Sequence, residues 1–227
     1  MINWEYLAAL DFSVLWVYRL PLLKGLAVTL VLTLLSSVMG AVAGTVLAIV
    51  SQLRPRPLRV LVAAYVELWR NTPLIVQLVW FHFALPTLTG IPTTVYVSGI
   101  LVLTLNVTAY FTEIIRAGIE AIDRGQHEAA MALGLPFQVR WRKVILPQAV
   151  RVMIPPLASL VISLLKATAI LSVLTINELM RVTVQLSNYT FKPVELLTAV
   201  AVVYVIAGVL LSRLFRFIEG RLWLPSH

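Results

Sequence analysis

The feature that most constrains this chain is a run from Gly25 to Leu53 that contains no charged residue. As a helix rising about 1.5 Å per residue, such a run more than crosses a bilayer hydrocarbon core of roughly 30 Å. The composition agrees, because 60% of the 227 residues are hydrophobic, only 12% are charged, and the mean hydropathy is +0.93. A soluble domain would be about half apolar and about a quarter charged. The sequence therefore predicts a membrane protein.

Further apolar stretches follow this run, and together they predict an all-α polytopic membrane protein with about five transmembrane helices. The predicted spans are residues 25–53, 60–85, 95–116, 152–176 and 196–214. Residues 1–24 mix aromatic and charged side chains, which is typical of an interfacial segment. We expect a short turn over 86–94, a loop outside the membrane over 117–150, and a polar link between the last two spans. Gly40 and Gly44 are spaced for close helix packing in the first span.

Basic residues give the predicted orientation. Of the 18 Lys and Arg, twelve fall on one predicted face of the membrane and four on the other. The positive-inside rule makes the richer face cytoplasmic, so we expect a multi-pass protein with the N-terminus outside and the C-terminus in the cytoplasm. The net charge of +8 is then explained by orientation, and nucleic-acid binding is not needed to explain it.

Several kinds of chemistry are excluded by composition. The chain has no cysteine, which excludes disulfides and thiolate metal sites, and its three histidines have no metal-ligand spacing. We therefore expect no metal site. The pattern Gly-x4-Gly-Lys-Ser/Thr is also absent, so the chain is not expected to bind ATP through a P-loop. No cofactor is expected on this chain, and any ATP-driven cycle requires a separate subunit.

The loop at 117–150 contains a predicted short helix of about three turns. Asp123 and Gln126 have the spacing of a capping box, and Gly134 with Pro136 supplies a stop. Small residues on this helix would allow it to enter a groove of another protein, with Glu128 offering charge-assisted bonds at the edge. The alternative is a surface helix that rests on its own membrane domain.

The same loop carries a spaced motif that reads Glu128-Ala-Ala-x3-Gly134-x9-Val144-x-Leu146-Pro147. This motif resembles the signature Glu-Ala-Ala-x3-Gly-x9-Ile-x-Leu-Pro of ABC importer permeases, and only the valine departs from it. The segments 65–77 and 109–118 resemble the permeases for polar amino acids, of the histidine, glutamine and glutamate type. The resemblance covers roughly residues 25–215. Where that subfamily more often has serine, this chain has Ala169, which removes a hydroxyl.

The resemblance implies that residues 1–227 form a single permease domain in the bacterial inner membrane. It also implies that the loop helix docks into an ATP-hydrolysing subunit. The residues implied in this coupling are Gln126, Glu128, Ala129, Ala130 and Gly134. ATP and Mg would be bound by the partner ATPase. The other implied partners are a second permease subunit, identical or related, and a periplasmic or lipid-anchored amino-acid-binding protein.

Charged residues inside the spans point to transport independently. Glu67 and Arg70 lie one turn apart in the second span, where an ionised group is costly unless paired, so we expect a buried ion pair between them. The alternative is that Arg70 lines a polar substrate path beside Pro73, which opens the helix backbone at this level. The other candidates for this path in the second span are Asn71, Thr72 and Gln77.

Lys166 is the charge in the fourth span, and it has no partner nearby in the sequence. It either reaches the interface by snorkelling or faces a cavity, where it would attract the α-carboxylate of an amino acid. Thr168 and Asn106 are further candidates to line such a cavity, although Asn106 is equally suited to bonding a neighbouring helix.

We therefore predict a permease subunit of an ATP-driven importer for polar amino acids, with acidic ones slightly favoured by the second span. The alternatives are a secondary carrier driven by an ion gradient and a membrane scaffold without transport. Secondary carriers commonly show internal repeats, which are not visible here. A scaffold would not require charged residues within its spans.

Overall fold

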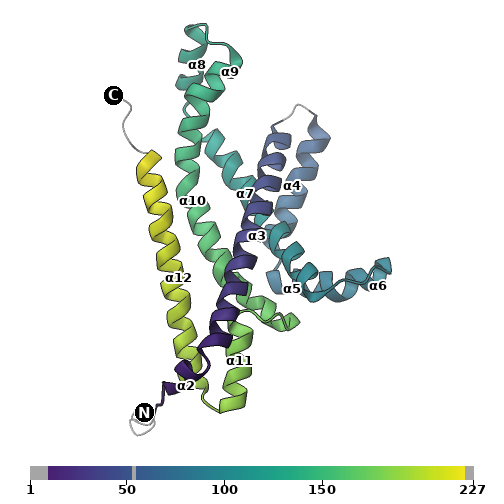
Figure 1. Ribbon diagram of the computed structural model, residues 1–227. Coiled ribbons are helices and arrows are strands. Elements are labelled where there is room, and N and C mark those ends of the chain that lie inside the picture. The colour runs from purple at the N-terminus through teal and green to yellow at the C-terminus, as the bar shows by residue number, and fades with distance from the viewer. Residues whose placement is uncertain (1–9, 53–54, 223–227) are drawn as a thin grey trace, which may run out of the picture.

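The computed structural model describes residues 10–52 and 55–222, and this part of the chain is helical without a strand (Figure 1). Its α-helices are α2 (Ser13–Val17), α3 (Arg19–Ser51), α4 (Arg56–Asn71), α5 (Leu74–Val79), α6 (Leu85–Thr89), α7 (Val95–Glu120), α8 (Arg124–Ala132), α9 (Phe137–Arg140), α10 (Leu146–Ala167), α11 (Leu179–Thr190) and α12 (Pro193–Leu222). Shorter helical segments continue three of them, namely the π-helical Trp80–Ala84 and Trp141–Ile145 and the 3₁₀-helical Thr168–Leu174.

Four stretches of this helical chain are long and apolar enough to cross a membrane. They are α3, α7, the continuous run Phe137–Leu174, and most of α12. A fifth span is formed if α4 and the helix Leu74–Thr89 are taken together, although the two meet at an angle of 105°. The prediction of an all-α polytopic membrane protein with about five spans is confirmed.

The helices extend beyond the predicted spans. The helix that contains the fourth predicted span begins at Phe137, because the π-helical segment Trp141–Ile145 joins α9 to α10 without a break. The predicted polar link contains the helix α11. At the N-terminus, α3 already begins at Arg19, while residues 1–9 of the predicted interfacial segment lie outside the described residues.

The centre of the bundle is the contact between α3 and α7. Gly40 and Gly44 face α7, and a Cβ added at Gly44 would stand 2.5 Å from the Cβ of Phe111. These glycines therefore allow the two backbones to approach closely, as their spacing predicted. Around this contact, Leu32, Val102 and Leu103 are almost completely buried.

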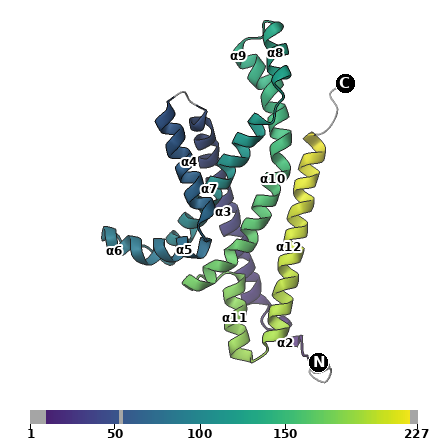
Figure 2. The same cartoon turned by 180° about the vertical axis from the view of Figure 1, so that it is seen from behind.

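The ends of the bundle carry different elements. In Figure 1 the start of the described chain and α11 lie at one end, and α8 and α9 lie at the other, on the same side as the C-terminal end of α12. We call the latter the α8 end. Seen from behind in Figure 2, the segment α5–α6 leaves the bundle sideways. The described chain thus begins and finishes at opposite ends, as an odd number of spans requires.

Candidate functional site: the loop helix and a cavity at a helix break

The predicted loop helix is present as α8. The Asp123 side chain caps it by accepting a hydrogen bond from the backbone N–H of Gly125 at 2.6 Å. After its last turn Gly134 adopts φ 67°, and the N–H of Leu135 donates to the carbonyl of Ala130 at 3.1 Å. The capping box also predicted that the Gln126 side chain would accept a hydrogen bond from the backbone N–H of Asp123. This part of the prediction is wrong, because the Gln126 side chain accepts from the Gln148 amide at 3.3 Å.

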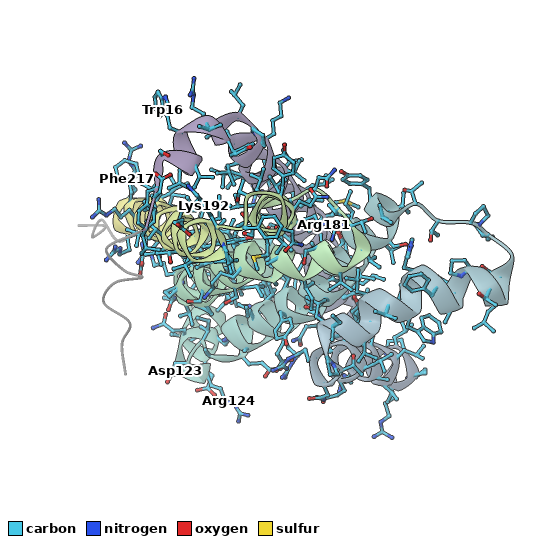
Figure 3. All side chains as sticks on the ribbon, turned by 90° about the horizontal axis from the view of Figure 1, so that it is seen from below. Trp16, Asp123, Arg124, Arg181, Lys192 and Phe217 are labelled. Atoms are coloured by element: carbon cyan, nitrogen blue, oxygen red, sulfur yellow. The ribbon has the colours of Figure 1, made fainter. Side chains whose placement is uncertain are left out.

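One face of α8 rests on the protein and the other is uncovered. Ala130 is 3% exposed and packs inward, whereas Glu128 and Ala129 are exposed. Near them Leu133 is 76% exposed, and Gly134 has no other atom within 4 Å of an added Cβ. Figure 3 shows Asp123 and Arg124, at the start of the helix, at the edge of the molecule. The residues predicted for coupling thus lie on a helix that presents apolar surface and a carboxylate outward.

A second site is the break between α4 and α5. Thr72 and Pro73 are both extended, which removes the hydrogen bonds that a continuous helix would make. The Gln77 amide donates to the carbonyls of Trp69 at 2.9 Å and Thr72 at 3.2 Å. Asn106 of α7 donates to the same Trp69 carbonyl at 3.2 Å and to the Gln77 oxygen at 3.0 Å. The two amides therefore stabilise the break.

A cavity of about 640 Å³ opens beside this break and lies between α7 and α10. The polar side chains that line it are Thr72, Asn106, Tyr110, Ser159 and Ser163. The volume is in the range of pockets that hold small molecules. The sequence reasoning missed Tyr110 and the two serines; the signal that would have found the serines is their spacing of four residues on a proline-containing helix.

The predicted ion pair between Glu67 and Arg70 is not formed. Arg70 reaches α7, where its Nη1 lies 3.9 Å from Oε1 of Glu113, and its guanidinium lies over the ring of Tyr110 at 5.5 Å from the centroid. Glu67 accepts a hydrogen bond from Asn71 at 2.5 Å. The correction has a simple reason, since Asn71 is also one helical turn from Glu67 and a second helix offers Arg70 a carboxylate.

The two candidates near the end of α10 do not join the cavity lining. Thr168 is completely buried and donates to the carbonyl of Leu165 at 2.7 Å, so its hydroxyl is used within its own helix. Lys166 is exposed on the surface of the bundle, next to Ala167, which lines the cavity. Of the predicted path residues, the structure therefore places Thr72 and Asn106 in the cavity wall and Gln77 and Arg70 close to it.

A buried carboxylate, Glu178, was missed because the sequence placed it in a polar link. It is completely buried at the start of α11, where it accepts from the backbone N–H groups of Met180 at 2.9 Å and Arg181 at 2.6 Å. The hydroxyl of Tyr204 on α12 donates to it at 3.2 Å. Burial raises the pKa of Glu178, while these hydrogen bonds act in the opposite direction. Glu178 therefore ties α11 to α12.

With the fold and both sites described, comparison with known proteins gives the family. The chain belongs to the family of binding-protein-dependent transport system inner membrane components, whose model matches residues 40–224. It is 35% identical to the arginine transport system permease protein ArtQ of Bacillus subtilis, over 94% of this chain and 97% of that protein. It is 36% identical to the putative glutamine transport system permease protein GlnP of Rickettsia bellii, over 96% of this chain and 98% of that protein.

Solved structures agree with this assignment. A chain of an amino acid ABC transporter crystallised with histidines has a TM-score of 0.88 and 33% identity, covering 94% of this chain and 99% of the other. A chain of the methionine ABC transporter MetNI in an inward-facing conformation shares the fold, with a TM-score of 0.77 and 22% identity. The predictions of an ABC importer permease and of an inner-membrane location are confirmed. Neither comparison supports a secondary carrier.

Proposed function

We propose that this permease carries a polar amino acid across the inner membrane and that a separate ATPase drives it through α8. The observation that carries the proposal is the combination of family membership with a loop helix whose outer face is uncovered. Relatives with named substrates include permeases for arginine, glutamine and octopine. All three are amino acids or amino-acid derivatives with a polar side group. An acidic substrate stays a prediction from the second span.

Docking of the ATPase is proposed on α8 and the turn that follows it. Glu128 supplies a carboxylate at the edge, and Met131, Leu133 and Phe137 are 54%, 76% and 65% exposed. A charged group beside exposed apolar side chains is the composition expected of a protein interface. Ala129 and Gly134 add little bulk, so the helix and the turn after it are narrow enough to enter a groove, and Gln126 is exposed on the same helix. ATP and Mg belong to that partner, and no cofactor is proposed for this chain.

The proposed substrate path runs through the cavity beside the break. Its hydroxyl and amide groups can hydrogen-bond a polar side group, and its remaining wall is apolar. Broken helices beside polar side chains are a common place for small charged substrates in transporters. We propose that Arg70, Asn71, Thr72, Gln77 and Asn106 contribute to this path directly or through the break. Lys166 and Thr168 are given no part in the proposed path.

The remaining partners follow from the family. A second permease subunit, identical or related, would complete the membrane unit, and an amino-acid-binding protein would deliver the substrate to the outer face. The proposed orientation places the α8 end in the cytoplasm, because the basic residues are concentrated there. The lipid bilayer surrounds the exposed apolar faces of α3 and α12, and no nucleic acid is involved.

The test is purification of the tagged chain from its native host in mild detergent, followed by mass spectrometry of the proteins that accompany it. The wild type is compared with Glu128→Arg and with the control Glu219→Arg, which makes the same charge change on α12. Recovery of a P-loop ATPase with the wild type and the control, and its loss in Glu128→Arg, is the expected result. A wild-type oligomer without any ATPase would refute the proposal.

A further inference from the structure

A second hollow lies beyond the cavity, toward the α8 end. It has a volume of about 410 Å³ and lies between α3, α4 and α7. Five charged residues line it, and we call it the charged groove: Arg59, Glu67, Glu113, Arg116 and Glu120. Under the proposed orientation, a substrate that leaves the cavity for the cytoplasm moves toward the α8 end, so it meets the residues between the two hollows.

Arg70 stands at this boundary. Glu67 of α4 lines the charged groove, Thr72 just after α4 lines the cavity, and Arg70 lies between them in the sequence. On α7, Tyr110 lines the cavity and Glu113 lines the groove. The Arg70 guanidinium contacts both of these α7 residues, with the Tyr110 centroid at 5.5 Å and the Glu113 oxygen at 3.9 Å. It therefore bridges the wall of one hollow and the wall of the other.

Glu113 does not depend on Arg70 for its position. Arg116 donates two hydrogen bonds to it, at 3.1 Å and 2.7 Å, and two more to Glu120, at 2.9 Å and 2.8 Å. By contrast, the contact between Arg70 and Glu113 is at the outer limit of an ion pair, and the two side chains are 36% and 30% exposed. Ion pairs of this length between partly exposed side chains contribute little to stability. Arg70 is thus a cation that can exchange its partner at low cost.

Every free amino acid carries an α-carboxylate, and arginine forms its strongest hydrogen bonds with carboxylates, in a two-bond geometry. We propose that Arg70 binds the substrate's α-carboxylate at the inner margin of the cavity, and that Glu113 holds Arg70 in place when the cavity is empty. When the substrate arrives, its carboxylate replaces Glu113 as the partner of Arg70, and Glu113 keeps Arg116. Arg70 and Glu113 therefore each keep an oppositely charged partner in both states. This inference rests on the proposed amino-acid substrate and names the group that is recognised.

The test is amino-acid binding to the purified permease–ATPase complex without its binding protein, in lipid nanodiscs. Each of the twenty amino acids is added in turn, and those that raise the melting temperature are compared with their C-terminal amides, which lack the carboxylate. For the wild type we expect the free acid to bind at least tenfold more tightly than its amide. In Arg70→Gln the acid should lose this advantage, and Arg70→Lys should restore part of it. Arg216→Gln on α12 is the control for loss of one positive charge.

A purely structural role for the ion pair makes a different prediction. If the Arg70–Glu113 contact only holds α4 to α7, then Glu113→Gln and Arg70→Gln should have the same effect. The proposal instead expects Glu113→Gln to keep the preference for the acid, because Arg70 then has no competing partner. Equal behaviour of the two variants, an amide that binds the wild type as tightly as the acid, or no response to any amino acid would overturn the inference. Uptake by vesicles that requires ATP tests the proposed function separately, so the two can fail independently.

Discussion

Replacing Gly44 with alanine is expected to destabilise the contact between α3 and α7. The added Cβ would lie 2.5 Å from the Cβ of Phe111, 3.0 Å from the carbonyl oxygen of Thr108 and 3.1 Å from the backbone N of Thr112. Two of these three atoms belong to the backbone of α7, and the third is fixed directly to it. A side-chain rotation therefore cannot relieve the overlap, and the two helices have to move apart.

The size of this effect follows from the packing. Overpacking of a tight interior costs about 1–3 kcal/mol. For a chain of this length, each kcal/mol lowers the melting temperature by roughly 2–4 °C, so Gly44→Ala should melt about 2–12 °C below the wild type. Gly40→Ala should cost less, because its nearest neighbour is the Val107 side chain and the nearest backbone atom is 3.4 Å away.

The assay is thermal unfolding in detergent, followed by far-ultraviolet circular dichroism. The matched control is Gly208→Ala on α12, where the nearest atom to an added Cβ is a methyl of Ile162 at 3.9 Å. This control should melt at or above the wild-type temperature, because alanine is the better helix former by about 1 kcal/mol. If Gly44→Ala melts together with Gly208→Ala, the reasoning about close approach is wrong.

The other predictions concern the break, the cavity and two carboxylates. Gln77→Leu should lower the melting temperature, because the Thr72 carbonyl loses its donor at a cost of about 1–3 kcal/mol, while the Trp69 carbonyl keeps the Asn106 donor. Ser163→Phe should reduce ATP-driven uptake in vesicles more than tenfold by filling the cavity, with Ser163→Ala as the control; unchanged uptake would place the path elsewhere. The hydrogen bond from Lys192 holds the pKa of Asp11 below its ordinary value, so the stability that this contact provides should begin to decline as pH falls below about 4, and the contact itself should be lost only at a lower pH. The measurement is backbone hydrogen exchange in α2 as a function of pH, and Asp11→Asn should remove the pH dependence of this exchange. The pH dependence at Glu178 runs in the opposite direction. Because burial raises the pKa of Glu178, the stability of the fold should fall as pH rises above the ordinary glutamate pKa of about 4.3. Melting temperatures of Glu178→Gln should lack this decline.

The sequence predicted those features that depend on composition and on local chemistry. Uncharged runs longer than a bilayer is thick located the spans, and Asp123 and Gly134 marked the start and stop of α8. The spacing of Gly40 and Gly44 predicted close packing without naming the partner helix. In each of these cases the physical cause lies within a few residues of its effect.

Features that depend on which helices pack against each other could not be predicted from the sequence. Glu67 and Arg70 had the correct spacing for an ion pair, but the choice of Glu113 as a partner requires knowing that α7 packs against α4. Glu178 appeared to be a residue of a polar link, and its burial arises only when α11 folds back against α12. The two serines of the cavity wall have meaning only once α10 is opposite the helix break.

The connection between α7 and α8 has a mechanical consequence. Only residues 121–123 separate the end of α7 at Glu120 from the start of α8 at Arg124, and Ile122 among them is 8% exposed. A connection this short, with a buried residue in it, allows little independent movement of the two helices. A displacement of α8 should therefore move the last turn of α7, which carries Glu120 and Arg116. The same helix forms a wall of the cavity further along. A single helix, α7, therefore joins the two sites, and under the proposed function its stiffness would determine how much of a displacement of α8 reaches the cavity.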